Sequence, residues 1–210
     1  MAAILLILSF CSAIAVQQLT NWLGFHGNVA VGIVQYGQAQ FGFLALDIAY
    51  IYYCDTPSLY VRFRRPRAQA FLWLGGMLLL IPVLSTPRPN WYVTEALVTS
   101  PALWVVVFVF WFGISVPAEE LLFRGIIQGR LREAFATPIA IPIAAVFFGL
   151  IHFLFTYFKS SHVSLSVFII TFTIGVCFGV AYELTENLAI VSFAHASFWI
   201  SPVVLHLLNA

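Results

Sequence analysis

The sequence predicts an all-α fold, a polytopic bundle of about seven transmembrane helices built as one domain of 210 residues. Hydrophobic residues make up 62% of the chain, charged residues make up 8%, and the mean hydropathy is +0.99. Soluble domains contain about 45–50% apolar residues, so this composition indicates an integral membrane protein. The net charge of +1 provides no basic surface of the kind that binds nucleic acid.

Each predicted span is a run of about 20 mostly apolar residues, the length that crosses a bilayer at about 1.5 Å per residue. Gly, Pro and Asn mark the connectors, as in the Thr86–Asn90 segment and at Thr137–Pro138. The first run lacks the preceding Lys or Arg of a signal peptide, so we expect it to remain as a helix. The predicted spans are residues 2–19, 29–53, 69–85, 101–131, 138–158, 164–184 and 187–208.

Arginine positions orient this bundle. Six arginines lie in the loops 62–67 and 130–132, whereas the opposite side receives Arg88 and Lys159. Cytoplasmic loops carry an excess of Lys and Arg. We therefore expect a cytoplasmic N-terminus and an external C-terminus, in a membrane of the bacterial cell type. Residues 1–100 then provide N-terminal spans, and residues 101–208 form the core that holds the polar side chains discussed next.

A charged cluster interrupts the apolar fourth span, where Glu119, Glu120 and Arg124 follow Pro117. The next basic residue is Arg130, so we expect the helix to continue through the cluster. Glu119 then lies about 16 Å from the cytoplasmic end, near the middle of a core about 30 Å thick. Pro117 is expected to kink the helix and to free a backbone carbonyl. Ionisable groups at this depth usually mark a functional site.

Two histidines on later spans reach comparable depths. His152 lies fourteen residues after Pro138, or about 21 Å into the membrane. His195 lies eight residues after Asn187, or about 12 Å into it. Three helices are therefore predicted to bring a carboxylate pair and two imidazoles to one region.

Helical geometry predicts different partners for the two carboxylates. Glu120 pairs with Arg124 four residues later, while Glu119 points about 100° away. Glu119 with His152 is then a candidate to activate water, and His195 to stabilise an oxyanion. One alternative is a structural charge cluster with hydrogen-bonded histidines. Another is zinc held by a glutamate and the two histidines, although the chain lacks His-Glu-x-x-His and the ligands would come from three helices.

The motifs Glu119-Glu120-x-x-x-Arg124 and Phe148-x-x-x-His152, followed by the late His195, resemble those of the CPBP (Abi) intramembrane glutamic proteases. That family includes the type II CAAX-prenyl endopeptidases, and the resemblance covers residues 101–208. It implies a membrane-embedded catalytic cavity in which Glu119 and His152 activate water and His195 stabilises the oxyanion. The remaining residues Glu120, Arg124 and Phe148 would support the site.

The same resemblance implies a peptide hydrolase that uses neither a metal nor another cofactor. Its substrate would be a membrane-associated protein or peptide within the lipid bilayer. One position departs from the family pattern, because Trp199 stands where His-x-x-x-Asn usually places an amide. Two groups offer a donor in place of the amide: the indole N–H of Trp199, or the Ser197 hydroxyl from a shifted angle. This departure leaves open the alternative that the chain is a non-catalytic member of the fold, which acts as a membrane scaffold or immunity-type partner protein.

Other polar residues are predicted to have ordinary roles. Asp47 is expected to snorkel to the membrane interface, and Glu183 and Glu186 to lie in a solvated loop. The three scattered cysteines indicate neither a disulfide framework nor a zinc site. A small-molecule transporter would favour internal repeats, and none is visible.

Overall fold

The structure, a computed structural model, describes residues 38–84, 108–159 and 165–208, together with eight isolated positions among the first 22 residues. Within these ranges the chain is helical and contains no β-strand, so the predicted all-α class is confirmed. The main helices are α3 (Gln38–Tyr53), α4 (Ala68–Leu84), α7 (Val116–Glu120), α8 (Gln128–Ala134), α9 (Thr137–Lys159), α10 (Leu165–Thr185) and α11 (Leu188–Leu208).

Six of the predicted spans overlap these helices. Two stretches, Thr137–Tyr157 and Leu165–Thr185, are long and apolar enough to cross a membrane, and Ala68–Leu80 and Leu188–Phe198 are shorter apolar helices. The first predicted span falls mostly outside the described residues. The count of seven spans therefore stays a prediction, whereas the all-helical, membrane-capable fold is observed.

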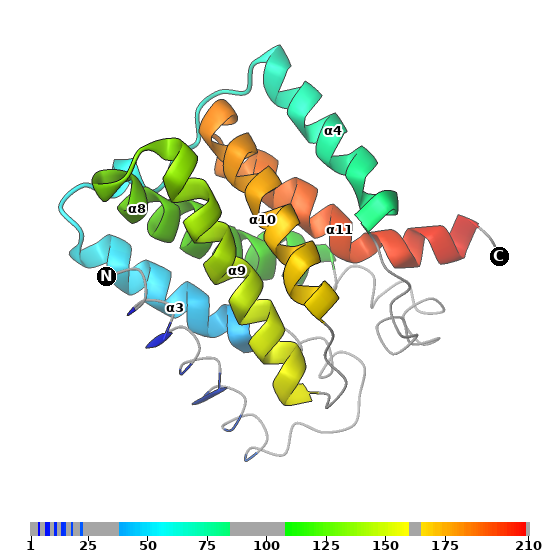
Figure 1. Cartoon of the computed structure of the whole chain (residues 1–210), viewed down its shortest axis with the longest axis horizontal. Coiled ribbons are helices and arrows are strands. Elements are labelled where there is room, and N and C mark those ends of the chain that lie inside the picture. The colour runs from blue at the N-terminus through cyan, green and yellow to red at the C-terminus, as the bar shows by residue number, and fades with distance from the viewer. Residues whose placement is uncertain are drawn as a thin grey trace.

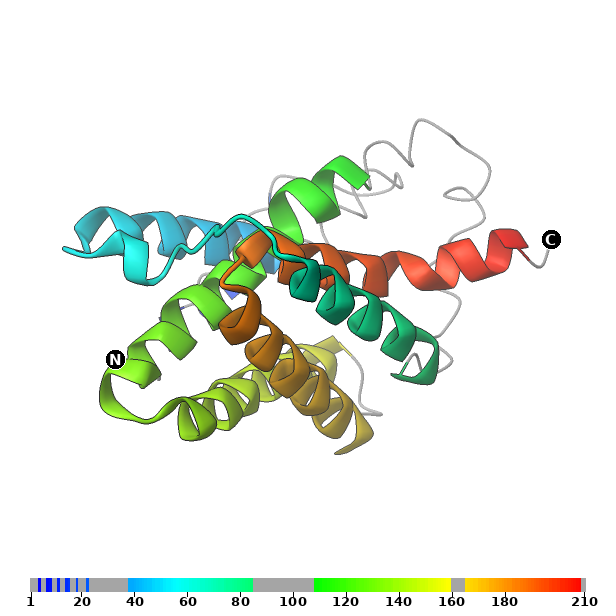
Figure 2. The same cartoon turned by 90° about the horizontal axis from the view of Figure 1, so that it is seen from above.

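A continuous helix over residues 108–134 lies at the centre of the bundle, and we call it the central helix. It is contacted by α3, α9, α10 and α11, while α4 packs against α10 and α11. Figures 1 and 2 show α3 and α4 on different sides of this assembly. The helix runs on beyond the two glutamates to Arg130, as the sequence predicts.

The central helix departs from α-helical geometry on both sides of the glutamates. The segments η3 (Trp111–Ser115) and η4 (Leu121–Ile127) are π-helical, and they flank α7. Pro117 has no backbone N–H to donate. The Val116 N–H bonds the Trp111 carbonyl five residues earlier. The expected disturbance at Pro117 therefore includes local widening of the helix, a feature frequent at functional sites.

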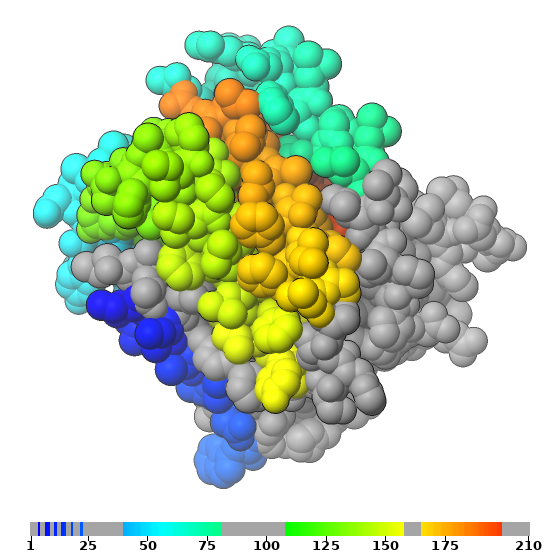
Figure 3. Space-filling view, in the orientation of Figure 1, coloured from blue at the N-terminus to red at the C-terminus, as the bar shows by residue number. Residues whose placement is uncertain are grey.

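The closest pair among the described helices is α9 and α10, which lie side by side on the face shown in Figure 3. Small residues permit this approach. A Cβ at Gly175 would lie 3.1 Å from the Ala145 Cβ, and one at Gly149 would lie 3.1 Å from the Phe168 ring. Such small residues let helix backbones approach closely in membranes. This packing fixes α9, and with it His152, against the rest of the bundle.

Residues 54–67 join α3 to α4, and we call this segment the strap. It contains the short helix η1 (Pro57–Leu59). Tyr60 fits a groove of the central helix, because a Cβ at Gly125 would lie 2.8 Å from the Tyr60 carbonyl oxygen and one at Gly129 would lie 2.8 Å from its ring. The Tyr182 hydroxyl also donates to the Tyr60 carbonyl at 2.8 Å. The strap is thus held directly against the helix that carries the glutamates.

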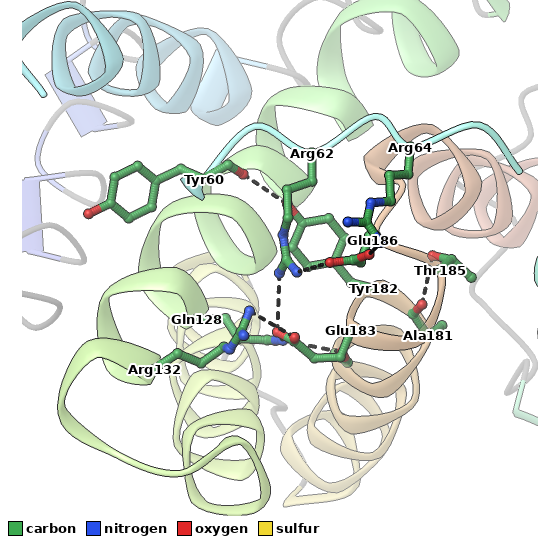
Figure 4. A network of polar contacts seen from close by, with 11 residues as sticks. Tyr60, Arg62, Arg64, Gln128, Arg132, Ala181, Tyr182, Glu183, Thr185 and Glu186 are labelled. Carbon is green, nitrogen blue, oxygen red and sulfur yellow. Dashed lines mark hydrogen bonds and ion pairs between the residues drawn. The ribbon is translucent and has the colours of Figure 1, made fainter. Parts of the chain in front are cut away.

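Glu183 joins the two arginine-rich loops (Figure 4). Its carboxylate lies 3.3 Å from Arg62 and 2.8 Å from Arg132, and it accepts a hydrogen bond from Gln128 at 2.8 Å. The side chain is 12% exposed. The prediction of a solvated loop is therefore wrong for Glu183, because the strap and α8 both close over the end of α10.

Glu186 continues this group of ion pairs at the turn between α10 and α11. Its carboxylate contacts Arg64 and lies 3.6 Å from Arg62. Backbone bonds join Arg64 N–H to the Glu186 carbonyl at 3.0 Å and Leu188 N–H to the Arg62 carbonyl at 2.9 Å. Glu186 is 31% exposed, so it too is held by the strap instead of lying free in solvent. The two arginine-rich loops share one end of the bundle.

Candidate active site

The sequence-predicted site residues meet in the interior, between the central helix, α9 and α11. Glu119, Glu120, Arg124 and His195 are all buried. The His152 side chain is 20% exposed. The depth estimates placed these side chains at overlapping levels, and the structure brings them into contact.

Glu119 and His152 form the first contact pair. His152 Nε2 lies 3.1 Å from Glu119 Oε1, and His152 Nδ1 lies 2.8 Å from the Phe148 carbonyl oxygen. A carbonyl only accepts, so Nδ1 carries a proton and donates it. The Nε2 contact then needs a proton of its own, supplied by an imidazolium or by a carboxylic acid. The pair therefore holds one proton between carboxylate and ring, and its net charge is zero.

Glu120 has different neighbours. Its Oε1 lies 2.6 Å from His195 Nδ1, and its Oε2 lies 3.1 Å from Arg124 Nε. The Arg124 contact lacks the alignment of a hydrogen bond, so it is an ion pair held by charge. Burying a carboxylate without a cation costs several kcal/mol. Arg124 therefore neutralises Glu120, as the four-residue spacing predicts.

Two aromatic rings surround these groups. The Arg124 guanidinium lies over the Phe148 ring at 4.2 Å and over the Phe178 ring at 5.5 Å. Phe148 also lies 4.4 Å from the His152 ring, and Phe178 lies 5.3 Å from the His195 ring. Phe148 belonged to a recognisable motif, whereas nothing in the sequence singled out Phe178. The rings lower the local polarity and so strengthen the electrostatic contacts beside them.

Gln128 is a buried polar residue that the sequence analysis missed. Its amide donates to the Gly179 carbonyl at 3.2 Å and to Glu183 at 2.8 Å. The signal was its spacing, since Glu120, Arg124, Gln128 and Arg132 recur every four residues along the central helix. This row of polar residues extends from the buried glutamate to the exposed end of α8.

Asp47 is fully buried, so the prediction that it snorkels to the interface is wrong. Among the described residues, neither of its carboxylate oxygens has a hydrogen-bond partner. One turn earlier on α3, Phe43 lies 6.2 Å from the Phe123 ring of the central helix. Asp47 lies one turn from a residue that packs against the central helix, and a count along one helix does not register such neighbours.

A small apolar pocket adjoins the site, and the glutamates do not line it. Phe178 and Ala194 separate it from His195. Its lining comes from α4, α10 and α11 and comprises Met77, Leu80, Ile174, Cys177, Phe178, Ala194 and Phe198. Within the described part of the chain, no three His, Cys, Asp or Glu side chains are grouped as a metal site. Trp199 lies on α11, and its side chain is outside the described residues.

Comparison with known families gives one match. Residues 99–201 match the model of a family described as "Type II CAAX prenyl endopeptidase Rce1-like". This range contains the glutamate pair, both histidines, and the aromatic residues around them. No curated protein and no solved structure shows significant similarity to the chain.

Proposed function

We propose that this chain, whose residues 99–201 belong to the Rce1-like family of type II CAAX prenyl endopeptidases, is an intramembrane endopeptidase of the glutamic type. Its substrate would be a membrane-associated protein or peptide cleaved near the C-terminus. The observation that carries the proposal is the buried contact of 3.1 Å between Glu119 and His152 inside the family domain. The two groups share a proton, which is the starting state for acid–base catalysis by a pair.

In the proposed reaction, a water enters between Glu119 and the scissile carbonyl carbon. The Glu119 carboxylate accepts one water proton while the oxygen forms the new C–O bond. The C–N bond then breaks, and the leaving nitrogen takes the proton held at His152 Nε2. Transfer of the proton from Glu119 to His152 restores the pair. No redox step or external co-reactant is needed.

The developing oxyanion needs hydrogen-bond donors or a cation. We assign this role to His195, whose Nδ1 faces Glu120 at 2.6 Å. The Glu120 carboxylate accepts from Nδ1, so Nε2 is the ring nitrogen that would donate to the oxyanion. Glu120 and Arg124 are then positioning residues, because they act through His195 and through the shape of the site.

A reconstitution assay tests the proposal. The purified chain would be placed in liposomes with a farnesylated peptide ending in Cys-aliphatic-aliphatic-X, the sequence that directs prenylation. Mass spectrometry would detect release of the C-terminal tripeptide. We expect Glu119→Gln and His152→Ala each to lower the rate by at least about 10²-fold, the lower range for a positioned acid or base.

Glu186→Gln is the matched control, because it makes the same chemical change at the end of the bundle outside the site. It should leave the rate within about threefold, in line with the small effect of partly exposed ion pairs. Full activity in folded Glu119→Gln protein would refute the mechanism. Absence of cleavage in the wild type, with partner capture unchanged in Glu119→Gln, would favour the scaffold alternative.

The proposal also includes the membrane arrangement. We infer a multi-pass protein of a bacterial-type cell membrane, with the strap and the loop 130–132 on the cytoplasmic side. The support is the concentration of arginines at one end of the bundle, where Arg62 and Arg132 share Glu183. Cysteine accessibility at residue 67 and at residue 88, measured in sealed vesicles, would test this orientation.

A further inference from the structure

We propose that the strap is a binding surface for anionic phospholipid headgroups. The inference does not depend on proteolysis, because it is based on a different end of the molecule. It starts from how rigidly the strap is held. Tyr60 fills the groove at Gly125 and Gly129, and the Phe63–Asn187 bridge fixes the following residues against the turn before α11.

Fixing the strap in this way divides its arginines into two groups. Arg62 and Arg64 point to Glu183 and Glu186, which neutralise them (Figure 4). Arg65 and Arg67 are exposed and make no ion pair with any described residue. Two guanidinium groups are thus presented outward from a segment whose backbone is held in place.

Exposed apolar side chains lie on the same strap as these two arginines and at the end of α3. Phe63 is 61% exposed and Leu59 is 55% exposed, although both belong to a segment that is pinned at neighbouring positions. At the end of α3, Tyr52 and Tyr53 are 79% and 82% exposed. Exposed aromatic residues at the end of a membrane helix are typical of the headgroup layer. The surface therefore offers apolar groups to the acyl boundary and cations to phosphate.

Charge at this end of the bundle points to an anionic occupant. This end of the bundle carries six arginines, at 62, 64, 65, 67, 130 and 132, and four carboxylates, at 55, 133, 183 and 186, which leaves two positive charges in excess. The strap joins two apolar helices, so it lies at the membrane surface, where lipid phosphates are abundant. Each basic residue near an anionic membrane increases binding by about fivefold.

The test measures lipid binding to the full chain in detergent by native mass spectrometry. The two ligands are dioleoyl phosphatidylglycerol and dioleoyl phosphatidylcholine, which share their acyl chains. We expect the wild type to prefer phosphatidylglycerol and the Arg65→Gln/Arg67→Gln variant to lose about thirtyfold in affinity for it. Binding of phosphatidylcholine should change little.

Three controls separate this surface from general effects. Arg65→Lys/Arg67→Lys keeps the charge and should keep the preference. The Arg88→Gln/Lys159→Gln variant loses the same amount of charge from the predicted opposite side, and it should keep the preference for phosphatidylglycerol. Phe63→Ser should lower the affinity for both lipids alike, by about tenfold, because burial of the ring does not depend on the headgroup.

Any of three results would overturn the proposal. The first is an unchanged phosphatidylglycerol preference in the Arg65→Gln/Arg67→Gln variant. The second is an equal loss in the Arg88→Gln/Lys159→Gln control. The third is displacement of the lipid by water-soluble glycerol phosphate, which would show a site for free phosphate. Because these experiments use no peptide substrate, their failure is distinct from a failure of the proteolysis proposal.

Discussion

Replacing Arg124 with methionine tests the assignment of the Glu120 ion pair to stability. Arg124 is 2% exposed and Glu120 is fully buried, with 3.1 Å between Nε and Oε2. Removing one partner of a buried pair costs about 3–5 kcal/mol, because the other charge is left without compensation. We therefore expect Arg124→Met to lower the free energy of unfolding by about 3 kcal/mol.

The double variant Glu120→Gln/Arg124→Met removes both charges and keeps two side chains of similar size. It should recover about 2 kcal/mol of the loss, since replacing a whole buried pair is often close to neutral. Unfolding by sodium dodecyl sulfate in mixed micelles, followed by circular dichroism and tryptophan fluorescence, measures both variants. A single-variant loss below about 1 kcal/mol, or a double variant less stable than Arg124→Met, would refute this reasoning.

The remaining predictions concern the strap and its surroundings. Gly125→Ala should cost about 1–3 kcal/mol, because its Cβ would lie 2.8 Å from the Tyr60 carbonyl oxygen. Gly113→Ala, on the same helix with nothing within 4 Å, should be neutral or stabilising in the same unfolding assay. Glu183→Gln should loosen the strap and speed tryptic cleavage after Arg62 and Arg64, which gel analysis would show. Hydrogen bonds from Tyr60 and then Arg130 hold the pKa of the Glu133 carboxyl below its usual range. The stability that this adds is present above about pH 4.3 and is lost as the pH falls further. At 44% exposure the effect is below about 1 kcal/mol, and Glu133→Gln should flatten that part of the unfolding profile. Cleavage in the proposed protease assay should persist in the presence of a chelator such as EDTA.

Local spacing and helix depth predicted much of the candidate site. The ion pair of Glu120 with Arg124 follows from one turn of helix, whatever surrounds it. His152 and His195 were placed by counting residues from helix ends, and the structure brings both against the glutamate pair. Depth along a helix is set by rise per residue alone. This is why positions far apart in the sequence could be matched without knowing how the helices pack.

Rotation about a helix axis was not predictable in the same way. Nothing in the residue pattern indicated that His195 turns its Nδ1 to Glu120, a contact of 2.6 Å. The burial of Asp47 and Glu183 likewise depends on which neighbour covers them, and both predictions of exposure were wrong. A connector such as the strap has no periodicity to read. Its one trace in the sequence was the Gly125-x-x-x-Gly129 spacing, typical of close helix contacts.

Under the proposed function, the two adjacent glutamates have different roles because their partners differ: Glu120 lies beside Arg124 and Glu119 lies beside His152. Arg124 is always charged and lies 3.1 Å from Glu120, so the two charges of this ion pair cancel. In the proposed mechanism, the proton held between Glu119 and His152, which lie 3.1 Å apart, moves from one to the other, and that pair is neutral as well. Both pairs therefore satisfy the requirement for little net charge in an apolar interior. Exchanging their roles would place the mobile proton beside the arginine, where a carboxylate has the least tendency to accept one. In the proposed mechanism, the order Glu-Glu-x-x-x-Arg makes Glu119, not Glu120, the group suited to accept a proton from water.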